Sequence, residues 1–422
     1  MSIKKWKNKI VNNSFSFAIL KKAVVTICSI IFVSLMSRYL GPSLKGEYST
    51  YMSWSSILVI ILQMGFFKLY PYYKRNHLEG NYKNIFFSIS FYKFIFLSII
   101  VVLCFPLFNK YSIDLIFPWT VLLNMLQGEC LFLTLVDNIK YQNVVSIIVY
   151  CLNVIDIFVL YKYAEPNVSY VFIVLIIRDI VAVVLCMILM KNKLVFSKQV
   201  ILIVKELIAK SVFPVIAALL VEINYRVDVI FLNRMVDNYF VGLYASGVTV
   251  AEMAWMIPDV FKEVLYNKTA TSDSIDKVCF SLRIAITTVT GCLIGLLFIG
   301  RPVIGLFFGA DYLEAYPVTM LIFLGVPFMA IFKVLNPLVQ ARGDWKVYII
   351  TLLMAAFINI ALNVILINIF GMFGAAGASI ISYSVAGVSL MIYFIRTFNV
   401  RVRDCVFVRK EDFIKLKNFI KK

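Results

Sequence analysis

The sequence predicts an all-α membrane protein with twelve transmembrane helices in two six-helix lobes. Hydrophobic residues make up 62% of the 422 residues and charged residues only 15%, whereas about 25% of the residues in soluble domains are charged. The mean hydropathy is +0.90, and apolar stretches long enough to cross a bilayer recur along the whole chain. The short alternating strands that would form a membrane β-barrel are absent from the sequence.

The apolar stretches divide the chain into twelve predicted spans. Each is about 20 residues long, which matches the thickness of the hydrocarbon core. The spans cover residues 17–37, 48–70, 85–107, 115–136, 142–161, 168–190, 211–232, 240–262, 281–300, 317–339, 347–369 and 374–395.

The basic residues predict the orientation of these spans. With the N-terminus placed inside, 30 of the 41 Lys and Arg residues fall in cytoplasmic segments, 6 in external segments and 5 within spans. Because cytoplasmic loops carry an excess of Lys and Arg, both termini are expected in the cytoplasm. The net charge of +18 is then explained by topology, with no nucleic-acid partner. Residues 1–22 lack a signal-peptide cleavage site and are expected to be a retained cytoplasmic tail.

A short internal repeat relates the two halves of the chain. Three residues recur 196 positions later, each time in the external turn between a first and a second helix: Arg38, Gly46 and Tyr48 match Arg234, Gly242 and Tyr244. Two halves of six helices would be parallel repeats with the substrate path between them. The predicted organisation is an N-terminal lobe (1–190), a cytoplasmic linker (191–210), a C-terminal lobe (211–397) and a basic cytoplasmic tail (398–422).

The stretch 212–232 carries the strongest functional signal. It is long enough to span the membrane, yet it contains Glu222, Arg226 and Asp228. A charge near the bilayer centre costs roughly 2.5–3.5 kcal/mol on insertion scales. Glu222 and Arg226 are four residues apart on one helical face, and Asn224 and Asp228 repeat this spacing on another face. The helix is therefore expected to face a polar interior; a structural ion pair between helices is the alternative.

Other ionisable residues also fall within the predicted spans. Arg178, Glu222 and Glu252 lie near mid-depth, Arg226 and Asp228 lie towards the outer half, and Lys93 and Lys333 towards the inner half. Lys68 and Asp259 lie near span ends, where they can extend to the interface. The five bases are Lys68, Lys93, Arg178, Arg226 and Lys333, and the seven acids are Glu129, Asp156, Asp179, Glu222, Asp228, Glu252 and Asp259.

Several kinds of active site are excluded by the sequence. The eight cysteines are scattered without a CxxC pair, so we read them as buried apolar residues and expect no metal or cofactor. His77 is the only histidine, so a metal site built from several histidines is not available. The segment starting at Gly41 resembles a P-loop but has Glu47 and Tyr48 where Lys and Ser/Thr are required. No predicted external loop is long enough for a soluble catalytic domain, so the protein is not expected to be an enzyme.

Proline, glycine and the C-terminal tail suggest further features. Pro214 and Pro327 are candidate hinges for alternating access, or kinks without a moving role. Gly371, Gly374 and Gly377 predict a small-residue turn that lets the last two helices approach closely. The tail is either disordered or an amphipathic helix on the anionic inner leaflet; its apolar residues are Phe413, Leu416, Phe419 and Ile420, with Lys415, Lys417, Lys421 and Lys422 around them.

Longer segments resemble a known family. FFGADYLEAYPV (307–318), QARGDW (340–345) and NIALNVILINIFGMFGAAGASIISY (359–383) are similar to the second half of O-antigen and capsule flippases of the Wzx type. SRYLGPSLKGEY and VGLYASGVTVAEMAWMIP fit the two repeat units. These flippases belong to the multidrug/oligosaccharidyl-lipid/polysaccharide (MOP) exporter superfamily. The resemblance covers nearly the whole chain, but it is diffuse and indicates the superfamily better than the substrate.

The resemblance implies two V-shaped lobes around a central cavity in a monomer of the bacterial inner membrane. It implies transfer of an undecaprenyl-pyrophosphate-linked sugar unit from the inner to the outer leaflet, without covalent catalysis. A polysaccharide polymerase and a chain-length regulator are the expected protein partners in O-antigen or capsule assembly, with membrane lipids around the protein.

The charged residues can be assigned roles in such a transport cycle. Because a pyrophosphate needs paired cations, Arg178 and Arg226 are the first candidates for substrate binding. Lys93 and Lys333 would form the inner entrance, with Lys68 as a further binding residue. Protonation of the acids could couple transport to an ion gradient, and the candidates are Glu222, Asp228 and Glu252. The alternative for the cations is simple pairing with membrane carboxylates.

Two other functions remain open. Seven intramembrane acids against five bases are compatible with a drug/cation antiporter of the same superfamily, for which an acidic cavity is expected. A membrane polymerase of polysaccharide assembly is the second alternative. Its loss would leave single exported units, whereas loss of a flippase would strand lipid-linked units inside.

Overall fold

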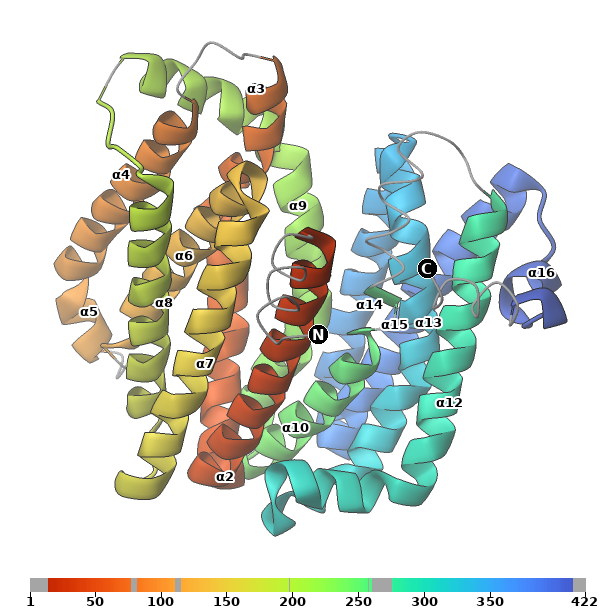
Figure 1. Cartoon of the computed structure of the whole chain (residues 1–422). Helices are drawn as coiled ribbons and strands as arrows, with labels where there is room; N and C mark the ends of the chain where they lie inside the picture. The colour runs from red at the N-terminus through yellow and green to blue at the C-terminus, as the bar shows by residue number, and fades with distance from the viewer. Residues whose placement is uncertain are drawn as a thin grey trace, which may run out of the picture. The chain divides into compact units, whose positions relative to one another are not determined.

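The computed structural model describes residues 14–76, 82–110, 115–196, 198–256, 258–259 and 275–412. Every regular element in these ranges is an α-helix or a short 3-10 helix (Figure 1). The prediction of an all-α membrane protein is thereby confirmed. The amphipathic tail face (Phe413, Leu416, Phe419, Ile420) and His77 lie outside the described residues.

The chain forms two compact units. Unit 1 comprises Met1–Leu44 and Trp54–Leu219, and unit 2 comprises Lys45–Ser53 and Leu220–Lys422. The helix that contains Leu219 and Leu220 therefore contributes to both units. The short segment Lys45–Ser53 belongs to the N-terminal half of the sequence but packs with the C-terminal half. The lobe boundaries predicted from the sequence remain a prediction.

Unit 1 is built from long apolar helices. Within it, α8 packs on α6 and α7, and α6 packs on α4. The elements are α2 (Ser14–Gln63, partly in unit 2), η1 (Phe66–Leu69), α3 (Tyr70–Asn76), α4 (Tyr82–Leu103), α5 (Phe105–Lys110), α6 (Phe117–Asp137), α7 (Ile139–Tyr163), α8 (Val168–Met190) and the first part of α9 (Lys198–Met235).

Two predicted spans are interrupted in unit 1. The span predicted over 48–70 ends as a helix at Gln63, because Met64 and Gly65 both adopt positive φ. A Cβ on Gly65 would lie 3.0 Å from the Val215 side chain, so the turn also needs a residue without one. The span predicted over 85–107 breaks at Cys104, two residues before Pro106 in α5. Proline lacks an amide donor and disfavours helical geometry in the residue before it.

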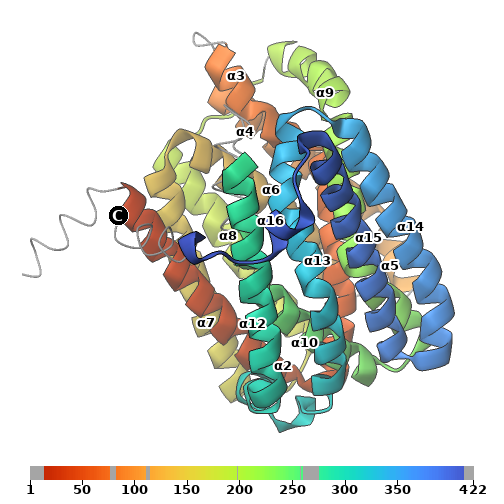
Figure 2. The ribbon, with the colours of Figure 1, turned by 90° about the vertical axis from the view of Figure 1, so that its right-hand side faces the viewer.

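Unit 2 places its helices in a row. Figure 2 shows α13 between α12 and α15, with α14 packed on α15. The elements are the end of α9, α10 (Asn238–Ala254), α12 (Ile275–Phe308), η2 (Ala310–Tyr312), α13 (Ala315–Ala341), α14 (Trp345–Phe370), α15 (Met372–Phe398) and α16 (Val402–Val406).

Proline and glycine act differently in the long helices. Pro214 lies inside α9 and Pro327 inside α13, and neither helix has a non-helical residue at that point. Their role as hinges remains a prediction. The predicted small-residue turn between α14 and α15 is confirmed. Gly371 has φ +56°, and a Cβ on Gly374 would lie 2.0 Å from the Leu366 carbonyl oxygen.

Nine helices of the described residues are long and apolar enough to cross a membrane. One of them is α2, which contains two of the predicted spans on either side of the break at Gly41 (φ 66°). Helices α9 and α10 overlap predicted spans but are not among the nine. The count of twelve crossings and the cytoplasmic termini therefore remain predictions.

The repeated glycines lie against each other in unit 2. A Cβ on Gly46 would lie 2.0 Å from the Asn238 carbonyl oxygen and 2.9 Å from the Gly242 amide nitrogen. Backbones approach this closely only where a small residue is present. The sequence repeat thus includes a helix–helix contact, between the second part of α2 and the start of α10.

Replacement of Gly46 should test this contact. We expect Gly46→Ala to lower the free energy of unfolding by about 1–3 kcal/mol, because the new methyl group overlaps backbone atoms that have little room to move. Gly291→Ala is the matched control, since a Cβ at Gly291 in α12 meets nothing within 4 Å. Thermal unfolding of the purified protein in detergent measures both. Equal melting of the two variants would contradict the contact.

Candidate functional site

A charged cluster lies on α9 and α10 in unit 2. The Arg226 guanidinium donates from Nε to Glu222 Oε1 at 3.2 Å, and its Nη1 lies 3.1 Å from Glu252 Oε1. All three side chains are partly exposed, by 32%, 19% and 28%. Glu222 and Arg226 lie on one face of α9, as their spacing predicts, and the Arg226–Glu252 contact is an ion pair between α9 and α10. With two carboxylates on one cation, the cluster is negative by one charge when all three groups are ionised.

Asp228 lies two residues further along α9 and is fully buried. Its carboxylate accepts hydrogen bonds from the Tyr244 hydroxyl of α10, from Ser379 Oγ of α15 at 3.1 Å and from the Val229 amide at 2.8 Å. A buried carboxylate requires such partners, because desolvation disfavours the charged form. The carboxyl group therefore ties three helices together at one point.

A buried hydrogen-bond network of three asparagines and one serine lies on the same helices as Asp228 or packs against them. The sequence analysis did not predict this network. Asn359 donates to the Asn224 side chain at 3.1 Å, Asn363 donates to Asn359, and Ser382 donates to Asn224. All four are buried. The sequence signal was present, since Asn359 and Asn363 are four residues apart in an otherwise apolar span.

Lys333 on α13 contacts a group of packed aromatic rings near the Arg226 cluster. Its ammonium donates to both oxygens of Asp259, at 2.9 and 3.0 Å, and lies 4.7 Å from the centre of the Trp255 ring. The Trp255 ring packs on Tyr225 and Tyr383, with ring centres 5.0 and 5.9 Å away. Since Tyr225 directly precedes Arg226, the aromatic group lies next to the charged cluster in unit 2.

The candidate cations of unit 1 are also paired. Lys93 on α4 donates to Glu129 on α6 and to the Gln63 carbonyl at 3.2 Å, and it lies 5.7 Å from the Phe66 ring centre. Lys68 is exposed and lies 5.9 Å from the Phe67 ring centre. Glu129 is only 1% exposed, so its charge depends on Lys93.

Arg178 on α8 pairs with its neighbour Asp179. The guanidinium Nε and Nη2 both lie 2.7 Å from Asp179 Oδ1. Asp179 is fully buried, and its other oxygen has no hydrogen-bond partner among the described residues. The Arg178 side chain remains 16% exposed.

The structure thus places these candidate cations against carboxylates: Lys93, Arg178, Arg226 and Lys333. Glu222, Arg226 and Glu252 come together in one cluster, with Asp228 in the adjoining buried network. Lys93 and Arg178 each have an acid of their own in unit 1. Within the described residues, no group of His, Cys, Asp and Glu side chains is arranged to hold a metal ion.

Comparisons with known proteins identify the fold. A search of protein-family profiles finds no match to the sequence, and a search of curated proteins finds none either. Among solved structures, the lipid II flippase MurJ in an inward closed conformation has a TM-score of 0.72 and 18% identity, over 92% of this chain and 88% of that one. The chain has the fold of MOP-superfamily transporters.

Two further structures agree with this assignment. An inward-facing MATE multidrug resistance transporter of the MOP superfamily gives a TM-score of 0.70 at 10% identity, over 90% of this chain and 98% of its own. A MOP transporter of Pyrococcus furiosus, described as having a binding pocket of reverse polarity, gives 0.60 at 10% identity, over 92% and 95%. At these identities the likeness establishes the fold alone.

The dependence of Glu129 on Lys93 can be measured. We expect Lys93→Met to lower the free energy of unfolding by about 3 kcal/mol, because it leaves a buried carboxylate without its counter-ion. The double variant Lys93→Met/Glu129→Gln should recover most of that loss. Lys210→Met is the control, since Lys210 and Glu206 form an exposed pair 2.6 Å apart, and exposed pairs contribute little to stability. Denaturant unfolding in detergent measures all three. A double variant no more stable than Lys93→Met would contradict the buried pair.

Proposed function

We propose that this protein is a flippase that moves an undecaprenyl-pyrophosphate-linked oligosaccharide from the inner to the outer leaflet of a bacterial inner membrane by alternating access. The observation that carries the proposal is the cluster of Arg226, Glu222 and Glu252, in which a partly exposed guanidinium is held inside a membrane-type helix bundle. The fold shared with MurJ and MATE transporters supports the same class of activity.

Carboxylate-paired arginines suit a cargo that must be released again. A pyrophosphate presents several oxygens with the geometry that a guanidinium binds through two parallel hydrogen bonds. In this proposal the phosphate exchanges with Glu222 or Glu252 on Arg226, and with Asp179 on Arg178. The positive charge is never left without a partner in a medium where that would be costly. The exchange is reversible, because the carboxylate recaptures the arginine when the cargo leaves.

The exchange also gives the acids a role in energy coupling. A carboxylate displaced from its cation inside the membrane must find another counter-charge, and a proton or a metal cation can provide it. Glu222 and Glu252 are the proposed acids at the cargo site. Asp228 is the proposed coupling acid in the buried network with Tyr244 and Ser379.

The lysines are proposed to guide the cargo at the inner side. Lys93 and Lys333 are each held by one acid and contact an aromatic ring. Aromatic faces can also contact sugar rings, which suits Trp255 and Tyr225 to the oligosaccharide. Lys68, at the cytoplasmic end of the span predicted over 48–70, is a further proposed binding residue. A polysaccharide polymerase and a chain-length regulator, acting in O-antigen or capsule assembly, are the proposed partners.

A drug/cation antiporter is the second candidate, and one observation favours it. Arg226 is outnumbered by Glu222 and Glu252, so the cluster is net negative when ionised and could attract an organic cation. The two functions predict opposite selectivity. An antiporter exports cationic dyes against a gradient, whereas a flippase moves an anionic lipid. A membrane polymerase would be distinguished by single exported units in a deletion strain.

The arginines should be required for surface polysaccharide. Arg226→Ala and Arg178→Ala should each reduce surface polymer per unit of protein by about tenfold or more, since one charge-assisted hydrogen bond is worth about 1.5–3 kcal/mol. Immunoblots of polymer and protein measure this in a strain that depends on the protein. Arg342→Ala is the matched control, because Arg342 pairs with Asp344 on the exposed surface of the same unit. Normal polymer from both Arg178 and Arg226 variants would remove these residues from the mechanism.

The coupling role of Asp228 can be separated from folding. Asp228→Asn keeps the size of the side chain and an oxygen that accepts from Tyr244, but it removes the charge. We expect transport by this variant to lose its dependence on an imposed pH or sodium gradient. Ser379→Ala removes one hydrogen bond without changing the charge and should keep that dependence. Proteoliposomes with defined gradients measure both, and an unchanged gradient response in Asp228→Asn would exclude Asp228 as the coupling acid.

A further inference from the structure

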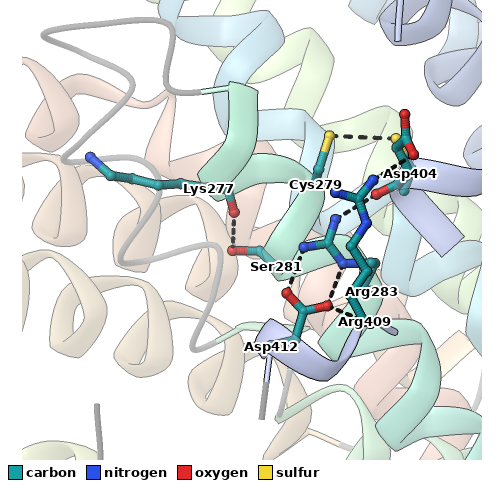
Figure 3. A network of polar contacts seen from close by, with 8 residues as sticks. Lys277, Cys279, Ser281, Arg283, Asp404, Arg409 and Asp412 are labelled. Carbon is teal, nitrogen blue, oxygen red and sulfur yellow. Dashed lines mark hydrogen bonds and ion pairs between the residues drawn. The ribbon is translucent and has the colours of Figure 1, made fainter. Parts of the chain in front are cut away.

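The segment after α15 folds back on the first turns of α12. Figure 3 shows this region, where Arg283 of α12 donates from Nε and Nη2 to the two oxygens of Asp412, both at 2.6 Å. Its Nη1 donates to the Asp404 carbonyl, and Arg409 pairs with the Asp404 carboxylate. Arg283 and Asp412 are both buried. The C-terminal segment is therefore held on α12 by a buried, fully matched ion pair.

A pair of thiols lies beside this ion pair. The Sγ atoms of Cys279 in α12 and Cys405 in α16 are 3.6 Å apart, although the residues are separated by 126 positions in the sequence. Both side chains are buried, with Cys405 fully inaccessible. Both cysteines are free thiols. The ion pair keeps the helices in register, so the two sulfur atoms remain close to each other.

A polar pocket reaches the thiol of α12. It has a volume of about 410 Å³, and its lining includes Cys279, Arg283, Arg401, Asp404 and Arg409. A small polar molecule fits in this volume. Cys405 lies behind Cys279, in contact with it through the two sulfur atoms. A reagent from the aqueous phase would therefore meet Cys279 first.

The surroundings make the two thiols unequal. The contact with Cys279 and burial raise the pKa of the Cys405 thiol, and either sulfur can donate in that contact. The Arg283 guanidinium follows four residues after Cys279 on the same helical face. A neighbouring guanidinium favours a nucleophilic sulfur. The chemistry thus assigns the first reaction to Cys279 and the second to Cys405.

We propose that Cys279 and Cys405 are a redox-active dithiol, which small hydroperoxides oxidise through the pocket to a disulfide that joins α12 to α16. In the first step the Cys279 sulfur attacks the peroxide. It takes one oxygen as a sulfenic acid, and the other oxygen gains the thiol proton and leaves as water from hydrogen peroxide, or as an alcohol from an alkyl hydroperoxide. In the second step the Cys405 sulfur displaces the hydroxyl group from Cys279, which leaves as water. One peroxide thus accepts two electrons from the two thiols, and a dithiol reductant reverses the change.

A second thiol pair in the protein provides an internal control. Cys28 in α2 and Cys151 in α7 have their Sγ atoms 3.9 Å apart in unit 1. Both residues lie within predicted membrane spans (17–37 and 142–161), where a water-soluble oxidant is scarce. The distance between the two sulfur atoms is therefore similar in the two pairs, whereas their access to water-soluble reagents differs.

The test is peptide mapping of the full-length protein in lipid nanodiscs after treatment with hydrogen peroxide and alkylation of the remaining thiols. We expect a Cys279–Cys405 linked peptide that disappears with dithiothreitol, with Cys28 and Cys151 still alkylated. In Cys405→Ser the second step is blocked, so dimedone should trap a sulfenic acid on Cys279. A correctly folded Cys405→Ser protein, judged by its elution and melting, makes this readout independent of stability.

Two results would overturn the proposal. One is the absence of the Cys279–Cys405 linked peptide while other thiols of the protein are oxidised. The other is formation of the Cys28–Cys151 disulfide to the same extent, because access through the pocket would then have no influence.

A third measurement tests how the disulfide affects the C-terminal segment. Oxidised protein should resist proteolysis within residues 399–412 more than reduced protein does, and Cys279→Ser should remove the difference.

Discussion

The need to neutralise ionised side chains within the predicted membrane spans governs the rest of this structure. Each of Lys93, Arg178, Arg226 and Lys333 has a carboxylate within 3.2 Å. A lone charge at this depth would be costly, and a paired one is tolerated. The helices that supply the partners are consequently held in register: α4 with α6, and α9 with α10. The ion pairs thus stabilise the packing of these helices, whether or not they also take part in transport.

The same pairing constrains how such a protein could work. A binding site made of bare cations would be unstable when empty, and a site of tight closed pairs would not bind an anion. The Arg226 cluster lies between these limits, because its three side chains are partly exposed and two acids share one base. In the proposed alternating-access cycle, exchange of partners would keep the charge balanced at each stage. By contrast, Asp228 is fully buried and bound by hydroxyl groups, which suits a group whose protonation changes inside the protein.

Local features were predictable from the sequence, and contacts between distant segments were not. The helix period predicted the Glu222–Arg226 pair, because both residues belong to one face of one helix. The partners of Lys93 and Lys333 are 36 and 74 residues away, and no periodicity relates them. The helix break at Gly65 was missed because a single glycine in an apolar run does not reveal a positive φ. The amides Asn359 and Asn363 were missed because a neutral side chain changes the hydropathy of a span only slightly.

The central claim is that the paired cations receive an anionic lipid headgroup, and transport by the purified protein tests it most directly. Proteoliposomes containing the protein would be loaded with a labelled undecaprenyl-pyrophosphate-linked oligosaccharide, and an impermeant enzyme would report which leaflet it occupies. The account predicts that the protein moves the lipid between leaflets, that Arg226→Ala slows this movement, and that an organic cation is not transported in parallel. Transport of the cation without movement of the lipid would contradict the account and favour the antiporter.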